Sequence, residues 1–199
     1  YSTDNKTWST TKPTRTNVGT TTVYVKVVGD GNHTDTNPIS STITITAQKL
    51  PAPTNINITT AGIVTWDSVP NATKYQISID GTNWTDATSG VDYLSKIIAA
   101  TGTRTVYVRA VGTGNYSNSD DKGCTASKSV YAVTINSNST TMGKFDTSSA
   151  TISYNVIEGA TYSTSSNKLS FVGITSGTTT KTLKTVTANA NTGYHFGSW

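Results

Sequence analysis

The chain has little of the material on which most enzymes and many small secreted animal domains depend. Its 199 residues include one Cys, two His and a single Glu, and only 13% of them are charged. One Cys excludes an intrachain disulfide, and so few His and Glu leave little material for acid–base or metal chemistry. No apolar run approaches the ~20 residues that span a bilayer. We therefore expect no catalysis, no cofactor and no membrane insertion.

Positive charge is also sparse once it is divided along the sequence. The net charge is +4, but residues 1–49 hold five basic and three acidic residues, residues 50–131 hold six of each, and residues 132–199 hold four and two. No segment forms the dense basic stripe that binding a run of phosphates requires. Nucleic acid is therefore not an expected partner.

Threonine replaces the missing charged and apolar residues. About a fifth of the sequence is Thr, with abundant Ser, Asn and Gly, and 34% is hydrophobic. Thr, Asn and Gly are poor helix formers, whereas Thr suits a pleated, half-exposed surface. Val and Ile recur in alternation, which is not typical of disordered chains. The composition predicts an all-β protein with small cores.

An internal repeat organises the first two thirds of the chain. Residues 22–33 (TVYVKVVGDGNH) reappear at 105–116 (TVYVRAVGTGNY), and Ser2–Trp8 matches Ser78–Trp84. Two copies of one β unit therefore stand in tandem. The first copy has nothing that matches residues 55–66, so we expect it to be incomplete and to have an open edge and an uncovered apolar row.

The second copy shows the alternation and turns of a β-sandwich. Strands are predicted over residues 55–60, 62–66, 74–79, 105–111 and 124–133. Asp80-Gly81 predicts a two-residue type I′ hairpin. The inward positions predict one shared core, made of Trp66, Tyr75, Ile77, Val106 and Val108.

The core positions of this copy carry a family resemblance. Val64-Thr65-Trp66, Tyr75-Gln76-Ile77 and the strand 106–110 resemble the core pattern of a fibronectin type III domain, although Arg104 stands where that family usually has a tyrosine. The resemblance implies an immunoglobulin-like sandwich over residues 51–131, with a truncated relative over 1–48.

Residues 132–199 have another rhythm, with strands predicted at 132–136, 151–157, 168–172 and 182–190. The final Gly193–Trp199 resembles the GYxFxxW signature of Listeria–Bacteroides (InlB B-type) repeats, which implies a small β-rich module of a bacterial surface protein. That family continues beyond this Trp, and Tyr1–Asp4 has the pattern of mid-strand residues, so we expect a piece of a longer protein.

Together these patterns predict tandem immunoglobulin-like β-sandwiches plus a small β-rich repeat module. The expected units are a truncated immunoglobulin-like unit (1–49), a fibronectin type III-like sandwich (50–131) and a clipped repeat-like module (132–199). They should lie in line with small, polar contacts between them.

Residues with possible chemistry are scattered. Asp120 and Asp121 are adjacent, so on a strand they would face opposite sides. His33 and His195 lie in different units. Asp30–Asp35 carries oxygen ligands that Ca²⁺ prefers, but its repeat counterpart keeps the turn with almost no acid. We expect no catalytic pair and no metal site, and Cys124 is predicted to be a small strand residue.

The four tryptophans divide into core and surface candidates. Trp66 and Trp199 are predicted to lie in the cores of their units. Trp8 and Trp84 follow hairpin turns at equivalent repeat positions. Repetition favours a requirement of the fold, and a sugar-stacking platform is the open alternative.

The expected function is that of non-catalytic spacer or adhesion modules in a bacterial cell-surface or secreted multidomain protein. The expected partner is a host or cell-wall glycan or protein, and no single ligand is indicated. Two alternatives remain open. One is an accessory carbohydrate-binding module of a secreted polysaccharide-degrading enzyme, and the other is a phage tail or capsid decoration domain.

Overall fold

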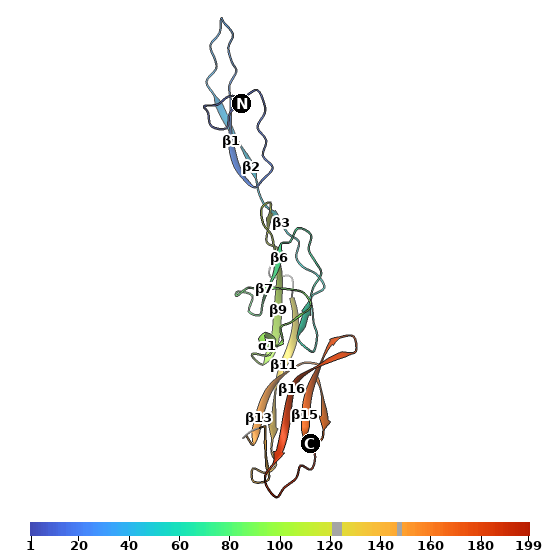
Figure 1. The fold of residues 1–199 in the computed structure, drawn as a ribbon. Coiled ribbons are helices and arrows are strands. Elements are labelled where there is room, and N and C mark those ends of the chain that lie inside the picture. Colours follow the sequence, from blue (N-terminus) through green and yellow to red (C-terminus); the bar gives the residue numbers. More distant parts are fainter. Residues whose placement is uncertain (121–124, 147–148) are drawn as a thin grey trace.

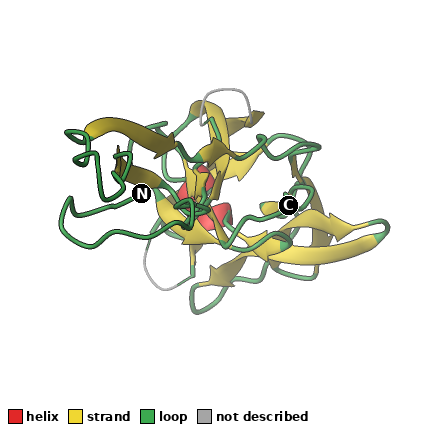
Figure 2. Ribbon diagram, turned by 90° about the horizontal axis from the view of Figure 1, so that it is seen from above, coloured by secondary structure: helices red, strands yellow, loops and turns green. Residues whose placement is uncertain are grey.

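A computed structural model describes residues 1–120, 125–146 and 149–199, so Asp121 and Cys124 lie outside the described part. The described residues hold sixteen β-strands and one short helix, α1 (Leu94–Ile97), which confirms the all-β class. The chain is elongated, with the first copy at one end and the third segment at the other (Figure 1). Strands and loops make up almost all of it (Figure 2). Within the described residues, no helix has the length and apolarity that crossing a membrane requires.

The first copy is a long two-stranded ribbon. β1 (Gly19–Val25) pairs antiparallel with β2 (Ile39–Ile45) over all seven residues of each strand. Ser2 bridges to Tyr24, so the N-terminal segment runs beside β1. The described residues place no second sheet over this ribbon.

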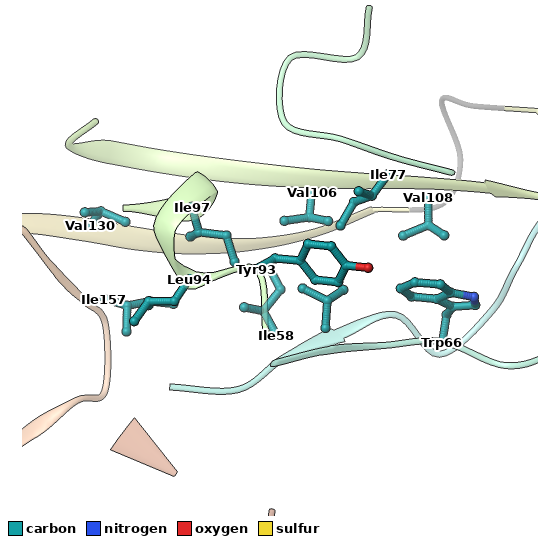
Figure 3. Packing of buried hydrophobic residues seen from close by; sticks show 11 residues of the cluster. Ile58, Trp66, Ile77, Tyr93, Leu94, Ile97, Val106, Val108, Val130 and Ile157 are labelled. Atoms are coloured by element: carbon teal, nitrogen blue, oxygen red, sulfur yellow. The ribbon is translucent and has the colours of Figure 1, made fainter. Parts of the chain in front are cut away.

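The second copy contains two sheets that face each other. One has the order β13-β11-β9-β6-β7, and the other has the order β4-β5-β8. Their strands are β4 (Asn57–Ile58), β5 (Ile63–Thr65), β6 (Lys74–Ser78), β7 (Thr85–Ala87), β8 (Val91–Asp92), β9 (Gly102–Val111), β11 (Thr125–Asn136) and β13 (Thr151–Ile157). The arrangement is sandwich-like, with the core between the two sheets (Figure 3).

The predicted core of this copy is confirmed. Trp66, Ile77, Val106 and Val108 are buried in one cluster, and Tyr75 packs against it. Helix α1 was not predicted. It begins after β8, where the Asp92 carboxylate accepts the Leu94 N–H at 2.8 Å, and it buries two apolar side chains in the same core (Figure 3).

The third segment forms a separate sheet with the order β12-β16-β15-β14. Its strands are β12 (Gly143–Phe145), β14 (Thr161–Ser165), β15 (Lys168–Ser176) and β16 (Thr179–Ala190). The remaining strand of this segment, β13, pairs with β11 instead. The third segment is therefore linked to the second copy through a shared sheet.

Strand β11 is continuous across residues 131–133, where the sequence predicted a boundary between units and two separate strands, 124–133 and 132–136. Its first half pairs with β9 and its second half with β13. The side that it buries changes along its length, from the side of Val130 to the opposite side at Val133. Alternating side chains point to opposite faces of a strand, so this change of phase gives the sequence pattern of two strands.

The expectation of small, polar contacts is wrong at this joint. Ile157, from β13, is 1% exposed and belongs to the core cluster of the second copy. The Ile174 N–H donates to the Thr60 hydroxyl at 2.6 Å, and the Ile174 carbonyl accepts the Ala61 N–H at 3.1 Å. The third segment therefore contributes Ile157 to the core of the second copy, and Ala160 and Leu183 pack against that core.

The joint between the two copies is smaller and is built mostly from hydrogen bonds. β3 (Gln48–Lys49) lies parallel to β10 (Tyr116–Ser117). The Asn115 side chain accepts the Val18 N–H at 2.9 Å and donates to the Thr16 carbonyl at 3.1 Å. Lys49 forms an ion pair with Asp120. One side-chain amide thus fixes the end of the first copy against the second.

Candidate functional site

The loop that leads to Trp84 is organised by one aspartate. The Asp80 carboxylate accepts the N–H groups of Thr82 at 2.8 Å and Asn83 at 2.7 Å, and it also accepts the Ser78 hydroxyl at 2.8 Å. The Asn83 side chain donates to the other oxygen of the Asp80 carboxylate at 2.6 Å. These bonds stabilise the charged form, so the pKa of Asp80 lies well below the ordinary value for Asp.

The first copy repeats this loop in detail. The Asp4 carboxylate accepts the N–H groups of Lys6 at 2.8 Å and Thr7 at 2.7 Å and the Ser2 hydroxyl at 2.8 Å. The pKa of Asp4 is lowered in the same way, chiefly by the bonds from the backbone. The repeated segment Ser-x-Asp-x-x-x-Trp therefore encodes one local structure twice.

The predicted type I′ hairpin is wrong at this loop. Type I′ requires positive φ at both central residues, but only Gly81 has it, at 75°, and the loop continues to β7 at Thr85. Asn5, the counterpart of Gly81, has a φ of 57°. The aspartate side chain replaces the short turn because its oxygens bond to the backbone two and three residues ahead.

Each loop places its tryptophan beside a cation, which is Arg109 of β9 in the second copy and Lys26, directly after β1, in the first. The Arg109 guanidinium lies 4.2 Å from the ring centroid of Trp84, and the Lys26 ammonium lies 4.8 Å from that of Trp8. Lys26 and Arg109 are themselves repeat counterparts. Both tryptophans are partly exposed, so the pair presents an aromatic ring and a cation on the outer face of each copy.

Polar neighbours hold each cation in place. The side-chain oxygen of Gln76 accepts two hydrogen bonds from the Arg109 guanidinium, at 3.0 and 2.8 Å. The side-chain NH₂ group of Gln76 donates to the Asp86 carboxylate at 3.0 Å. In the first copy, Asp35 pairs with Lys26 at 2.5 Å. Lys74 also donates to Asp86, at 2.9 Å. The pKa of both aspartates is lowered, chiefly by the bond from Lys26 to Asp35 and by the bond from Lys74 to Asp86. The platform is thus preorganised, with one ring face already covered by the cation.

The sugar-stacking prediction for Trp8 and Trp84 remains a prediction, and the geometry sharpens it. The two residues lie on different copies, so they form two separate platforms. A sugar would stack on the ring face opposite the cation, or it would displace the cation. Gln76, Asp86 and Arg109 would offer hydrogen bonds beside the second platform.

A second candidate surface lies at the far end of the third segment. An open cavity of about 540 Å³ is lined there by β12, β16 and the C-terminal segment, including Met142, Phe145, Asn189, Tyr194, Phe196 and Trp199. Trp199 was expected in the core, but it is 37% exposed and stacks on Phe145 with a centroid separation of 6.0 Å. The sequence did not predict this cleft, although the aromatic residues of the Gly193–Trp199 signature line it.

Other residues with possible chemistry are engaged in local structure. The Glu158 carboxylate accepts the Ser129 N–H at 3.0 Å, which lowers its pKa. His33 lies 2.8 Å from Asp30 in an exposed turn. Asp30 and Asp35, the calcium candidates, bond to His33 and Lys26. In the described ranges, no group of three His, Cys, Asp or Glu side chains is placed to hold a metal ion.

No family model, no curated protein and no solved structure matches the chain.

Proposed function

We propose that the chain consists of non-catalytic spacer and adhesion modules from a bacterial cell-surface or secreted multidomain protein. Its units would project a distal part away from the cell and present polar, threonine-rich surfaces. The function needs stiffness along the chain and no chemistry at any one residue.

We also propose that residues 50–131 form an immunoglobulin-like sandwich of the fibronectin type III kind. The distribution of strands supports this assignment. The first, second and fifth strands of the copy, β4, β5 and β8, form one sheet, and the third, fourth, sixth and eighth, β6, β7, β9 and β11, lie in the other. The seventh strand, the two-residue β10, pairs with β3 instead. Apart from the fourth strand and the short β10, constant-type immunoglobulin domains divide their strands in the same way.

The observation that carries the spacer proposal is the construction of the two joints. β11 runs through the second joint without a break, and Ile157 of the third segment is buried in the core of the second copy. The first joint has a parallel strand pair and the two bonds of Asn115. A continuous strand and a shared core resist bending, whereas a flexible linker does not.

Distance measurements between the ends would test this stiffness. Spin or dye labels at Thr42→Cys and Ser163→Cys, with Cys124→Ser to leave two thiols, should give one narrow distance distribution. Asn115→Ala should broaden it, because both side-chain bonds across the first joint are lost. Asn32→Ala is the matched control at the equivalent repeat position and should change nothing. A broad distribution in the otherwise unchanged chain would contradict the proposal.

Carbohydrate binding is the second candidate, favoured by the exposed aromatic rings at Trp84 and in the C-terminal cleft. Affinity electrophoresis in gels of several polysaccharides would test it. Trp8→Ala, Trp84→Ala or Trp199→Ala should each reduce the retardation that its own surface causes, so the variant that is affected identifies the binding surface. Tyr162→Ala is the control, because this residue is 71% exposed on the opposite edge of the third sheet. Without retardation in any gel, the spacer proposal stands alone.

A further inference from the structure

The first copy exposes an apolar face that its counterpart buries. Val25 is 36% and Val27 67% exposed, whereas their repeat counterparts, Val108 and Ala110, are fully buried. Ile39, which pairs with Val25 across the ribbon, is 74% exposed. Contiguous apolar side chains of this kind mark an interaction surface.

The second copy shows what covers such a face. Residues 48–66 run along it as one segment. They begin with β3, bury Leu50, and continue into β4 and β5. Ile58 in β4, Val64 in β5 and Trp66 directly after β5 are buried in one cluster with Val106 and Val108. Figure 3 shows Ile58 and Trp66 facing these two valines. The first copy has no counterpart of this segment within residues 1–49.

The edge on which β3 docks is also reproduced in the first copy. Gly112 N–H donates to the Asn118 side chain at 3.2 Å, and Gly29 N–H donates to Asp35 at 3.0 Å. The Ser119 hydroxyl accepts the Ala110 N–H at 2.9 Å, as the Thr36 hydroxyl accepts that of Val27. The loops 29–36 and 112–119 therefore have the same hydrogen bonds.

The two edges differ in their occupancy. The Asn115 carbonyl accepts the Gln48 N–H at 2.9 Å, and the Ser117 carbonyl accepts the Leu50 N–H at 3.1 Å. Among the described residues, the counterpart carbonyls of Asn32 and Thr34 accept no backbone N–H. The carbonyl groups that would accept a docked strand are thus already in position in the first copy.

We propose that this face and this edge together form a docking site for a segment with the pattern of residues 48–66. Its first residues would lie parallel to Asn32–Thr34. Two short strands would then bring an Ile, a Val and a Trp over the apolar row of Val23, Val25 and Val27. The segment would enter on the N-terminal side of Tyr1, because Tyr1 is the counterpart of Ile77, which follows residues 48–66 in the second copy.

The kind of segment that would bind follows from the second copy, where residues 48–66 cover the equivalent face and edge. The face is apolar and β-branched, and the edge offers backbone carbonyls at the spacing that a parallel strand uses. Backbone bonds of this kind provide affinity, and alternate apolar side chains provide specificity. The docking surface is a property separate from the spacer function, which would hold without it.

The test adds the segment to the full chain. A copy of residues 48–76 is placed directly before Tyr1, so that its last residue takes the place of Gln76 before Ile77. Hydrogen exchange by NMR should show amides of Val23–Val27 protected at least about tenfold more than in the unextended chain, because the added side chains bury the valines. The added counterparts of the Gln48 and Leu50 amides should become protected as well.

A matched extension provides the control. The same 48–76 copy, with serine at the positions of Ile58, Val64 and Trp66, should leave the exchange of Val23–Val27 unchanged. Equal protection with both extensions, or with neither, would overturn the proposal. So would a concentration-dependent dimer of the unextended chain that protects Val23–Val27 as strongly as Val106–Ala110, because a second copy of the chain would then be the occupant.

Discussion

The two copies of the repeat have nearly the same strand and very different surroundings. Val23, the first valine of the TVYV segment, is half-buried on a two-stranded ribbon, whereas its counterpart Val106 is fully buried between two sheets. The loops before and after these strands nevertheless have the same hydrogen bonds. Loop structure in this repeat is therefore local, whereas burial depends on a second sheet.

This comparison separates two sources of order. The Ser-x-Asp loop and the Gly-x-Gly-Asn turn are encoded within a few residues, because side-chain oxygens bond to nearby backbone N–H groups. Burial of the valine row depends on residues 48–66, a segment for which residues 1–49 contain no counterpart. Substitutions in the core should thus affect the copies unequally, and substitutions in the loops should affect them alike.

The largest expected effect follows from Trp66→Ala. Trp66 is 6% exposed and packs against Tyr75 with a centroid separation of 5.6 Å. Removing a large buried ring costs about 3–5 kcal/mol, which approaches the whole stability of a small domain. Chemical denaturation should show the second copy largely unfolded, while the fluorescence of Trp8 in the first copy stays unchanged.

A loss below about 1 kcal/mol would mean that the strand register is wrong, since such a value is typical of a surface substitution. Loss of signal from the first copy as well would mean that the two copies unfold as one unit.

The pair Val108→Ala and Val25→Ala breaks the comparison at equivalent positions. Val108 is fully buried, so losing two methyl groups and leaving a small cavity should cost about 2 kcal/mol. Val25 is 36% exposed, so the same change should cost less than about 0.5 kcal/mol. Urea unfolding of each variant would measure both values. Equal costs would show that something covers Val25 in solution.

Much of this architecture could be predicted from periodicity and self-comparison. The all-β class and the core around Trp66 and Val106 are confirmed, because strict alternation reports which side of a strand is buried. Helix α1 was missed because four residues carry no helical period. The continuous β11 was missed because Val130 and Val133 change the buried side.

The candidate site was less predictable, because it depends on residues that meet only in the fold. Trp84 could be singled out by repetition, but its contact with Arg109 depends on the register of β6 and β9, which the sequence does not state. The C-terminal cleft depends on Trp199 stacking against Phe145, 54 positions earlier. A signature motif indicates aromatic clustering and does not distinguish a core from a cleft wall.

The cation–tryptophan pairs should give a smaller effect that is similar in the two copies. Arg109→Met and Lys26→Met keep the length of the side chain and remove the charge above the ring. An exposed cation–π contact contributes about 0.5–1 kcal/mol, so each copy should lose stability of that order in urea unfolding. A much larger loss from Arg109→Met would indicate that the bonds to Gln76 dominate.

The smallest effect concerns acid, and it should be the same in both copies because the aspartate loops are equivalent. Bonds from Asn83 and Thr82 lower the pKa of Asp80, and backbone bonds from Thr7 and Lys6 lower that of Asp4. A carboxylate with a lowered pKa stabilises the fold above its unfolded pKa, about 3.9, and this contribution disappears as the pH falls through the folded pKa.

Carboxyl ¹³C shifts followed by NMR should therefore show both groups still ionised at pH 3.5. Ser2→Ala and Ser78→Ala should each raise the pKa of the neighbouring aspartate, since one bond to the charged form is lost. Ordinary titration of either group would mean that its loop is open in solution.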